Sequence, residues 1–538
     1  MDKKSVEKTV DRIDYVNESL CSGVKHILDY DGKNQLMING IKYTYRELKQ
    51  FVDNVSGNMR RQAVKKGDYI AIIMENSIEY IISLLALLKI GAVPILISPR
   101  WKEEEIRNVM EDANPKGIIC CEEAGNNKVG MHISNYLSTY GKNTRNVFYI
   151  GDNWYGCKGI EFGVLLEKCT SNFAWNEAES SEIAVISYTS GTTGKPKGVV
   201  ITHNKCMGVL GQLENLSVLK YEDKVFVIAA MYSIQGLIAI LHGFMVHATV
   251  KVAMSFSIHD ICQEIEKEED SVLVTQPTIC NLTLNEMNDN ERAFIAVQKI
   301  ILAGAFCRPE LAKEIEKKAN CKVQIVYGMT ETTGAVCIVR ENEVEDVRIN
   351  TVGEPIQGVE VKIVDEKRKI VQQNEVGELA VRGYCMEGYY RNDEETQKIM
   401  DSDGWLYTGD LAKFYDNKNI CIVGRIKDMI IRGGMNVFPE DIEECLIKCE
   451  SVKDASVVGK AHNILIEQII AFVVPEEGKQ CDIRELYKSL NQHLSNYKVP
   501  DKILLIKEMP INASGKISKQ ILREWAISGI PEKSKYQS

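Results

Sequence analysis

The sequence predicts an α/β protein, with a large N-terminal domain of doubly wound sheets, a β-rich subdomain and a small α+β C-terminal domain. Three observations support this class. Residues 23–120 alternate between strand-like and helix-like segments, which is typical of parallel sheets flanked by helices. From about residue 354 the pattern changes to short strands separated by turns. After Arg425 it changes again, to a mixed unit that runs to the end of the chain.

The first elements follow one another in the order expected of a doubly wound sheet, since strand, helix, strand implies parallel pairing. The most apolar stretch, residues 80–98, is interrupted by Lys89, Gly91 and Pro94, so we interpret it as a buried helix and a buried strand and predict no membrane span. The predicted elements are a strand at 36–45, a helix from Arg46 to about Val64, a strand at 69–74, a helix from Ile78 to Leu88, a strand at 93–98, a helix at 101–113 and a strand at 117–121.

The same alternation continues in the second half of the large domain. Buried strands again separate helical segments, one of them acidic. The predicted elements are strands at 225–230, 249–254, 272–277, 299–305 and 322–328, and helices at 234–248, 258–269, 279–288 and 310–319. A further helix is predicted from Ile483 to about Leu494 in the small domain.

Composition limits the functional classes. The 538 residues are too many for one core, and the net charge of −10 without a long single-sign run gives no support for nucleic-acid binding. The 16 cysteines and 8 histidines are scattered, which indicates reduced core thiols and not disulfides or a zinc site. The charged N-terminus is unlike a secretory signal. We therefore expect a cytoplasmic protein.

The most informative stretch is residues 188–199, YTSGTTGKPKGV, which follows a buried strand at 183–187. Its glycines allow backbone N–H groups to approach an anion closely, and its hydroxyls and lysines add further donors. This composition predicts a phosphate-binding loop. It is not the usual GxxxxGK[ST] loop, because Pro196 follows Lys195. A solvated surface loop is the alternative interpretation.

A second stretch, residues 326–334 (VYGMTETTG), ends a predicted strand with an aromatic ring, a hydroxyl and a carboxylate. These groups are Tyr327, Thr330 and Glu331. In open α/β sheets, ligands bind at the carboxyl ends of the strands. The alternative is a β-bulge with ordinary polar residues.

The residue order in these stretches, above all G-T-T-G-x-P-K-G, resembles the adenylate-forming superfamily. That superfamily contains acyl-CoA synthetases, adenylation domains and luciferases. The resemblance extends from about residue 23 to 525, and the segments 302–306 (LAGAF), 403–411 (DGWLYTGDL) and 422–443 also carry it. It implies the fold stated above, and it says little about which acid is used.

The resemblance implies an ATP and AMP site with Mg²⁺ on Glu331. It implies that Tyr327 stacks on adenine, that Thr330 contacts the α-phosphate, and that Asp410 accepts hydrogen bonds from the ribose. By composition alone Asp410 could be a turn residue and Arg425 a surface ion-pair partner. The implied nucleotide-binding residues are Thr189, Ser190, Gly191, Thr192, Thr193, Gly194, Lys195, Lys197, Gly304, Ala305, Tyr327, Gly328, Asp410 and Arg425.

The C-terminal part matches the mobile small domain of the superfamily. We predict a boundary between residues 1–424 and 425–538, with the hinge at Lys427. Lys516 matches the lysine that reaches the nucleotide during adenylation and would act with Thr330 and Glu331, although on its own it could be one of many exposed lysines. Paired glycines allow close passage of a pantetheine arm. The predicted thiol path is Arg432, Gly433 and Gly434.

The implied activity is an ATP-dependent activation of a small carboxylic acid to an acyl-adenylate, followed by transfer to coenzyme A. A carrier-protein phosphopantetheine is the alternative acceptor, and a non-catalytic nucleotide-binding protein is a third interpretation. Many acyl-CoA synthetases have a histidine where this chain has Ser233. This departure weakens any transfer of substrate preference. The predicted acyl-pocket walls are Tyr232, Ser233, Gly236, Ala303 and Met329.

Overall fold

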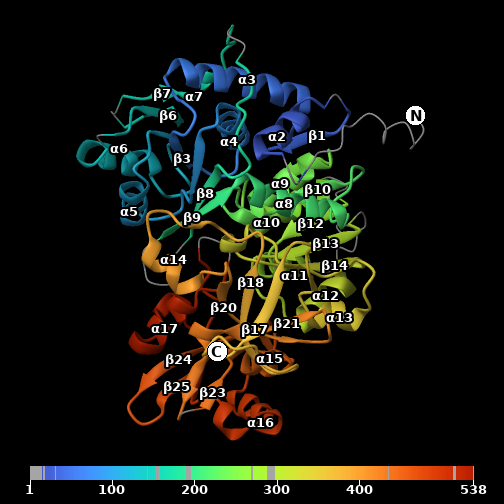
Figure 1. Ribbon diagram of the computed structural model, residues 1–538. Coiled ribbons are helices and arrows are strands. Elements are labelled where there is room, and N and C mark those ends of the chain that lie inside the picture. Colours follow the sequence, from blue (N-terminus) through green and yellow to red (C-terminus); the bar gives the residue numbers. More distant parts are fainter. Residues whose placement is uncertain are drawn as a thin grey trace. The chain divides into compact units, whose positions relative to one another are not determined.

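The computed structural model divides the chain into two compact units (Figure 1). Unit 1 contains Met1–Arg348, Glu354–Glu360 and Val381–Leu406, and unit 2 contains Ile349–Gly353, Val361–Ala380 and Tyr407–Ser538. The structure describes residues 15, 18–30, 32–141, 143–152, 154–155, 158–170, 173–189, 196–267, 271–287, 297–433, 435–512 and 516–536.

The first sheet of unit 1 has nine strands in the order β16-β15-β14-β13-β12-β10-β11-β1-β2. The six strands from β14 to β1 in that order pair in parallel, and the strands outside them are antiparallel. This confirms the doubly wound prediction. The strands are β1 (Gln35–Ile38), β2 (Ile41–Thr44), β10 (Lys224–Val227), β11 (Thr249–Val252), β12 (Val272–Thr275), β13 (Lys299–Ala303), β14 (Lys322–Tyr327), β15 (Cys337–Ile338) and β16 (Glu354–Pro355).

The second sheet of unit 1 has eight strands in the order β19-β9-β8-β4-β3-β5-β6-β7. Strands β3 to β8 pair in parallel, whereas β9 is antiparallel to both β8 and β19. The strands are β3 (Tyr69–Ile73), β4 (Val93–Ile97), β5 (Gly117–Cys121), β6 (Asn146–Ile150), β7 (Ile160–Glu161), β8 (Ile183–Thr189), β9 (Lys197–Thr202) and β19 (Gly388–Tyr389).

Two apolar helices, α4 (Ile78–Ile90) and α9 (Ile234–Met245), line a common cavity of about 10 Å³. A cavity of that size holds one water molecule at most, so little space is left between the side chains that line it. Both are buried around most of their circumference, and Lys89 is accommodated in α4 because its ammonium lies 2.5 Å from the carboxylate of Asp53. Gly91 ends α4 in the left-handed region, as the sequence predicted.

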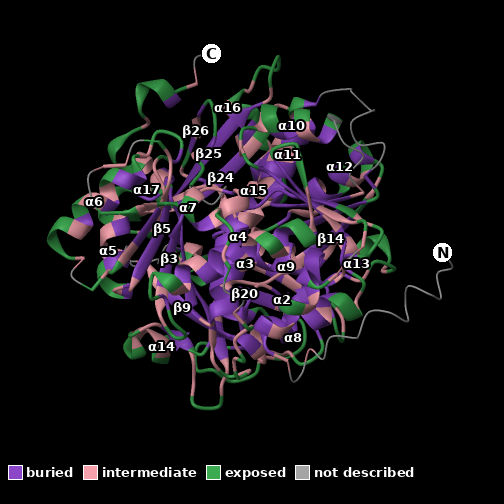
Figure 2. Cartoon of the chain, turned by 90° about the horizontal axis from the view of Figure 1, so that it is seen from above, coloured by how far each residue is buried: buried purple, intermediate pink, exposed green. Residues whose placement is uncertain are grey.

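The remaining helices of unit 1 cover the two sheets. In Figure 2 the residues of α5 change from buried on one side to exposed on the other, as is typical of a helix that covers a sheet. The remaining helices are α2 (Leu20–Leu28), α3 (Tyr45–Arg61), α5 (Glu103–Ala113), α6 (Val129–Thr139), α7 (Phe162–Leu166), α8 (His203–Asn215), α10 (Ile258–Lys267), α11 (Pro277–Glu286), α12 (Pro309–Ala319), α13 (Glu345–Asn350) and α14 (Asp393–Ile399).

One local prediction was wrong. The segment 36–45 is not one strand but the hairpin β1–β2, because Asn39 and Gly40 both have positive φ and form the turn. The glycine-rich segment stands between β8 and the antiparallel strand β9, and α8 begins after β9.

Unit 2 contains two sheets. The first has the order β17-β18-β20-β21 and confirms the predicted β-rich texture after residue 354. The second has the order β23-β22-β25-β24 with β26 beside β25, and α15 (Pro439–Ile447), α16 (Ile483–His493) and α17 (Lys519–Ser528) accompany it. The strands are β17 (Glu360–Val364), β18 (Gly377–Arg382), β20 (Leu406–Phe414), β21 (Ile420–Arg425), β22 (Ile430–Arg432), β23 (Met435–Val437), β24 (Val452–His462), β25 (Ile466–Pro475) and β26 (Lys502–Leu505).

The compact units are not the predicted domains. Unit 2 begins well before residue 425 and takes in β20 and β21. The boundary at 424/425 concerns rotation about Lys427, and it stays a prediction. Among the described residues, the cysteines are all free thiols, and none of the helices is long and apolar enough to cross a membrane.

Candidate nucleotide and acyl site

The carboxyl end of β14 continues as a tight turn in unit 1. Thr330–Thr332 form a short 3-10 helix, and the Thr332 hydroxyl both accepts from the Met329 N–H and donates to the Met329 carbonyl oxygen. A β-carbon on Gly328 would lie 2.4 Å from the carbonyl oxygen of Gly334, so only glycine permits this backbone approach. The turn therefore fixes the direction in which Thr330 and Glu331 leave the strand.

Glu331 is buried, with 8% of its surface exposed, and its carboxylate accepts a 2.8 Å hydrogen bond from the Tyr389 hydroxyl. Burial, together with Glu331, raises the pKa of Tyr389, so this phenol remains a donor. The sequence predicted the carboxylate but not its partner, since Tyr389 comes from the distant strand β19. A carboxylate oriented in this way supplies the hard oxygen ligand that a cation such as Mg²⁺ prefers.

Lys197 connects the same region to the glycine-rich segment. Its ammonium lies 5.0 Å from the centre of the Tyr389 ring and forms an ion pair with Glu395 of α14. Hydrogen bonds from Lys197 and Lys398 lower the pKa of Glu395 to about 2. Lys197 therefore fixes the end of the loop to β19 and α14, a role that the sequence did not suggest.

The loop itself is only partly described. Thr189 ends β8, opposite Lys197 in the β8–β9 ladder, and its hydroxyl lies 3.5 Å from the Lys197 carbonyl oxygen. The other predicted loop residues lie outside the described residues. They are Ser190, Gly191, Thr192, Thr193, Gly194 and Lys195.

At the carboxyl end of β13, Ala303, Gly304 and Ala305 are half-buried. The side-chain amide of Gln235 and the Cγ of Gln276 lie beside Gly304, and the Gln235 amide donates to the carbonyl oxygen of Thr275 at 3.1 Å. The structure thus brings the end of β12 and the start of α9 to the predicted nucleotide-binding residues Gly304 and Ala305.

The predicted acyl-pocket residues at the start of α9 have mainly local roles. The Ser233 hydroxyl caps the helix: it accepts from the Gly236 N–H at 3.1 Å and donates to the Ala230 carbonyl oxygen at 2.7 Å. A β-carbon on Gly236 would lie 2.1 Å from that same oxygen. Tyr232 is buried, which raises its pKa, and it lies beside Ser98 and Arg100.

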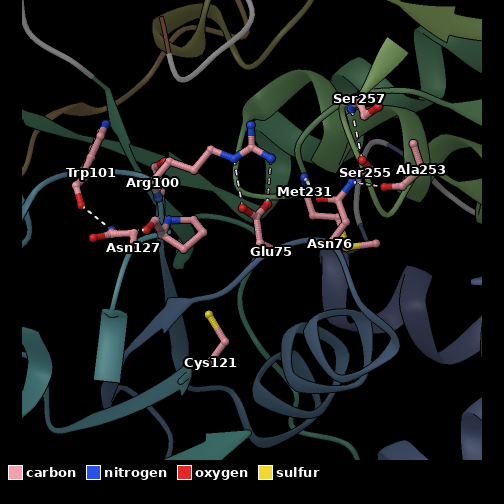
Figure 3. A network of polar contacts seen from close by, with 12 residues as sticks. Glu75, Asn76, Arg100, Trp101, Cys121, Asn127, Met231, Ala253, Ser255 and Ser257 are labelled. Carbon is pink, nitrogen blue, oxygen red and sulfur yellow. Dashed lines mark hydrogen bonds and ion pairs between the residues drawn. The ribbon is translucent and has the colours of Figure 1, made fainter. Parts of the chain in front are cut away.

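Figure 3 shows a network at the ends of β3 and β4 that the sequence did not reveal. The Arg100 guanidinium donates to both carboxylate oxygens of Glu75, at 2.9 and 3.4 Å. The Asn76 amide donates to the carbonyl oxygens of Ala229 and Ala253 and accepts from the Met231 N–H. Asn76 therefore joins the carboxyl edges of the two sheets of unit 1. In the sequence, the only signal for this role of Asn76 was its place directly after a predicted strand.

In unit 2, the structure brings Asp410 and Arg425 together across β20 and β21. The Arg425 Nε lies 2.7 Å from the Asp410 Oδ1, and the Asp410 carboxylate is buried. The preceding Gly409 N–H donates to Glu378, whose pKa is raised by burial. The backbone N–H of Asp410 donates to the Thr408 hydroxyl at 3.1 Å. A fixed carboxylate of this kind is suited to accept from paired hydroxyls.

The other predicted residues of unit 2 lie in different surroundings. Lys427 follows β21, and burial with Arg425 nearby lowers its pKa. Arg432 is occupied within the unit, because its guanidinium donates to the carbonyl oxygens of Tyr497 and Val499 and to Asp501. The Arg432 side chain therefore connects β22 to residues 497–501 within unit 2. Gly433 is described, whereas Gly434 lies outside the described residues.

Comparison with known proteins identifies the chain. A model of the AMP-binding enzyme family matches residues 27–390, which is more than half of the sequence. The chain belongs to the AMP-binding enzyme family. A model of the AMP-binding enzyme C-terminal domain also matches residues 441–516. These matches confirm the resemblance found in the sequence.

Individual relatives of this AMP-binding enzyme match along most of their length. The 4-coumarate:CoA ligase 1 of Petunia hybrida is 27% identical, over 92% of this chain and 92% of the relative. The mitochondrial medium-chain acyl-CoA ligase ACSF2 of Rattus norvegicus is 27% identical, over 90% and 83%. The solved anthranilate CoA ligase AuaEII, in complex with anthranoyl-AMP, has a TM-score of 0.86 at 20% identity, over 95% and 98%. That likeness confirms the fold class.

The Lys197–Glu395 ion pair yields a first prediction for this AMP-binding enzyme. We expect Glu395→Gln to raise the KM for ATP roughly fivefold with kcat nearly unchanged, because the loop end loses its anchor. Glu394→Gln is the matched control, since Glu394 precedes it on α14 and pairs only with Lys398 among the ion pairs of the described residues. The acid-dependent rate, measured at varied ATP concentrations, gives the KM for ATP of both variants. A wild-type KM in Glu395→Gln would show that Lys197 has no anchoring role.

Proposed function

We propose that this chain is an AMP-forming acid–thiol ligase that converts a small carboxylic acid to its coenzyme A thioester. The observation that carries the proposal is the buried Glu331, held by Tyr389 in the same network as Lys197 at the end of the glycine-rich segment. The family match and the ligase names of the relatives support the reaction class.

In the first half-reaction, a carboxylate oxygen of the acid forms a bond to the α-phosphorus of ATP. The bond to the bridging oxygen breaks, and pyrophosphate leaves with its electron pair. Both reactants are anions, so catalysis requires positive charge and hydrogen-bond donors around the α-phosphate. Thr330, the loop donors and Lys516 are assigned this role. Asp410 and Arg425 are assigned to the ribose.

Mg²⁺ bound at Glu331 would supply positive charge to the phosphate oxygens. The Tyr389 hydroxyl orients the carboxylate for this purpose, since its proton is donated to Glu331. Thr330 is the next oxygen donor along the turn. These residues fit the ion through their hard oxygen donors.

In the second half-reaction, the sulfur of a thiol forms a bond to the acyl carbon, and the bond to the adenylate oxygen breaks, so that AMP leaves. We assign the thiol to coenzyme A because the named relatives are CoA ligases. Rotation at Lys427 would bring Arg432, Gly433 and Gly434 to the thiol path. We place the activity in the cytoplasm, a choice supported by the many thiols in the sequence.

Acid-dependent exchange of pyrophosphate into ATP tests the proposal. A panel of aliphatic, aryl and amino acids is assayed first, and free coenzyme A is then added to the best substrate. Exchange followed by acyl-CoA formation is the expected result. Pyrophosphate exchange without formation of acyl-CoA would indicate that the acceptor is a carrier protein. ATP binding without exchange for any acid would refute the ligase activity.

A further inference from the structure

One ion pair connects α17 to the turn that contains the predicted hinge, and a second connects α17 to α15. The Arg523 guanidinium of α17 lies 2.6 Å from the carboxylate of Asp428, the residue directly after Lys427. The Lys519 ammonium, one helical turn earlier on α17, lies 3.0 Å from Glu443 of α15. Lys519 and Arg523 are four residues apart and so lie on one face of the helix.

Three of these four side chains are well shielded from solvent. The side chains of Asp428, Glu443 and Lys519 are 13%, 13% and 19% exposed. Glu443 also accepts from the Val457 N–H at 2.7 Å, which attaches it to β24. Ion pairs that are shielded from solvent hold their two side chains in place, because the loss of one partner leaves the other as a poorly solvated charge.

The segment that carries Lys516 is joined directly to this helix. Ser518 caps α17, and its backbone N–H donates to the Pro510 carbonyl oxygen. The Lys516 N–H donates to the Asn512 side chain, while the Lys516 carbonyl oxygen accepts from the Asn512 N–H. A change in the orientation of α17 would therefore also move Lys516, which lies three residues before the first residue of that helix.

We propose that Asp428, Glu443, Lys519 and Arg523 are positioning residues that fix Lys516 relative to the hinge turn during adenylation. The inference rests on the proposed function, because it assigns a use to the position of Lys516. Thioester formation has no need of Lys516 in that scheme. Loss of the ion pairs therefore affects one half-reaction and spares the other, which a purely structural role would not do.

Ionisation of Glu440 makes the stability of this ion-pair cluster depend on pH. Burial raises its pKa to about 7, and the groups that face it are Lys519 of α17, Glu443 of α15 and Asp428 of the hinge turn. Its Oε1 lies 3.9 Å from the Lys519 ammonium. Because folding raises the pKa of Glu440, the contribution of this group to the free energy of unfolding is complete below its unfolded pKa of 4.5. This contribution is lost as the pH rises through about 7. The cluster is therefore weakest above neutral pH.

The test compares half-reactions in the full-length enzyme. Arg523→Met is expected to lower the rate of pyrophosphate exchange by about 10- to 100-fold, with the KM for ATP unchanged, because Lys516 is displaced. Conversion of supplied acyl-adenylate to thioester should stay within about threefold of wild type. Arg523→Lys keeps the charge and is expected to recover most of the exchange.

Lys448→Met is the matched control, since it removes an exposed ion pair with Glu444 on α15 at 2.6 Å. It should leave both half-reactions unchanged. Equal loss of both half-reactions in Arg523→Met, or no loss in either, would overturn the positioning role. Failure of wild type to exchange pyrophosphate with any acid would instead refute the proposed function.

Urea unfolding of wild type and Glu440→Gln provides an independent readout of the cluster. The midpoint for wild type is expected to fall relative to that of Glu440→Gln as the pH rises from about 4.5 to about 7, because in this range the unfolded chain has released the Glu440 proton while the folded protein retains it. A constant difference between the two midpoints across this range would remove Glu440 from the proposal.

Discussion

Replacement of Lys516 by alanine is expected to reduce acyl-adenylate formation by about 100- to 1,000-fold while leaving thioester formation from supplied acyl-adenylate largely intact. The attack of a carboxylate on ATP accumulates negative charge, and Lys516 is the cation assigned to oppose it. Thioester formation expels AMP from a neutral acyl carbon without that lysine. Pyrophosphate exchange measures the first step, and acyl-CoA formation from synthetic acyl-adenylate measures the second.

Lys453→Ala provides the matched control for Lys516→Ala. Lys453 is an exposed lysine of β24 in the same unit, so the change removes an equal charge and an equal side chain. Both half-reactions should be normal in this variant. Equal loss of both half-reactions in Lys516→Ala would contradict the separate use of the small domain in the two steps, and with it the hinge at Lys427.

Glu331→Gln is expected to lower the rate of pyrophosphate exchange by about 100-fold and to raise the Mg²⁺ concentration needed for half-maximal rate. The substitution keeps the size of the side chain and removes its charge. The 2.8 Å hydrogen bond from Tyr389 can persist to the amide oxygen, so the turn at Thr330–Thr332 should keep its shape. A titration of exchange rate against Mg²⁺ checks both effects.

Tyr389→Phe separates charge from orientation at the same site. It keeps the Glu331 side chain but removes its hydrogen-bond donor, and we expect a loss of about tenfold in exchange rate. A larger loss in Tyr389→Phe than in Glu331→Gln would indicate that the carboxylate holds the tyrosine in place and does not hold the metal. A normal Mg²⁺ requirement in Glu331→Gln would lead to the same conclusion.

Local patterns in the sequence were sufficient for most of the fold. The helix from Ile78 and the buried strand at 69–74 were predicted within about two residues, because apolar runs, caps and glycine stops act over short distances. The resemblance to the superfamily also placed Asp410 and Arg425 in one predicted site, and the structure brings the two side chains into contact across neighbouring strands.

Contacts between distant segments could not be predicted. Tyr389 and Glu395 follow Lys197 by nearly 200 residues, and no periodic pattern connects them. The resemblance predicts Arg432 for the thiol path, but it gave no sign that the guanidinium is bound to Asp501 and two carbonyl oxygens in unit 2. The hairpin at Asn39–Gly40 is a different kind of error, since an Asn-Gly turn is a recognisable sequence signal.

The cap at the start of α9 limits how this enzyme can be redesigned. Engineers who wish to give it the acid preference of a relative would begin by grafting the histidine found at position 233 in many acyl-CoA synthetases. Here that exchange would also delete the hydroxyl that closes the first turn of a buried helix, a loss of about 1 kcal/mol. Selection for a new substrate at this position is therefore coupled to selection for folding, and compensating substitutions elsewhere in α9 should accompany it.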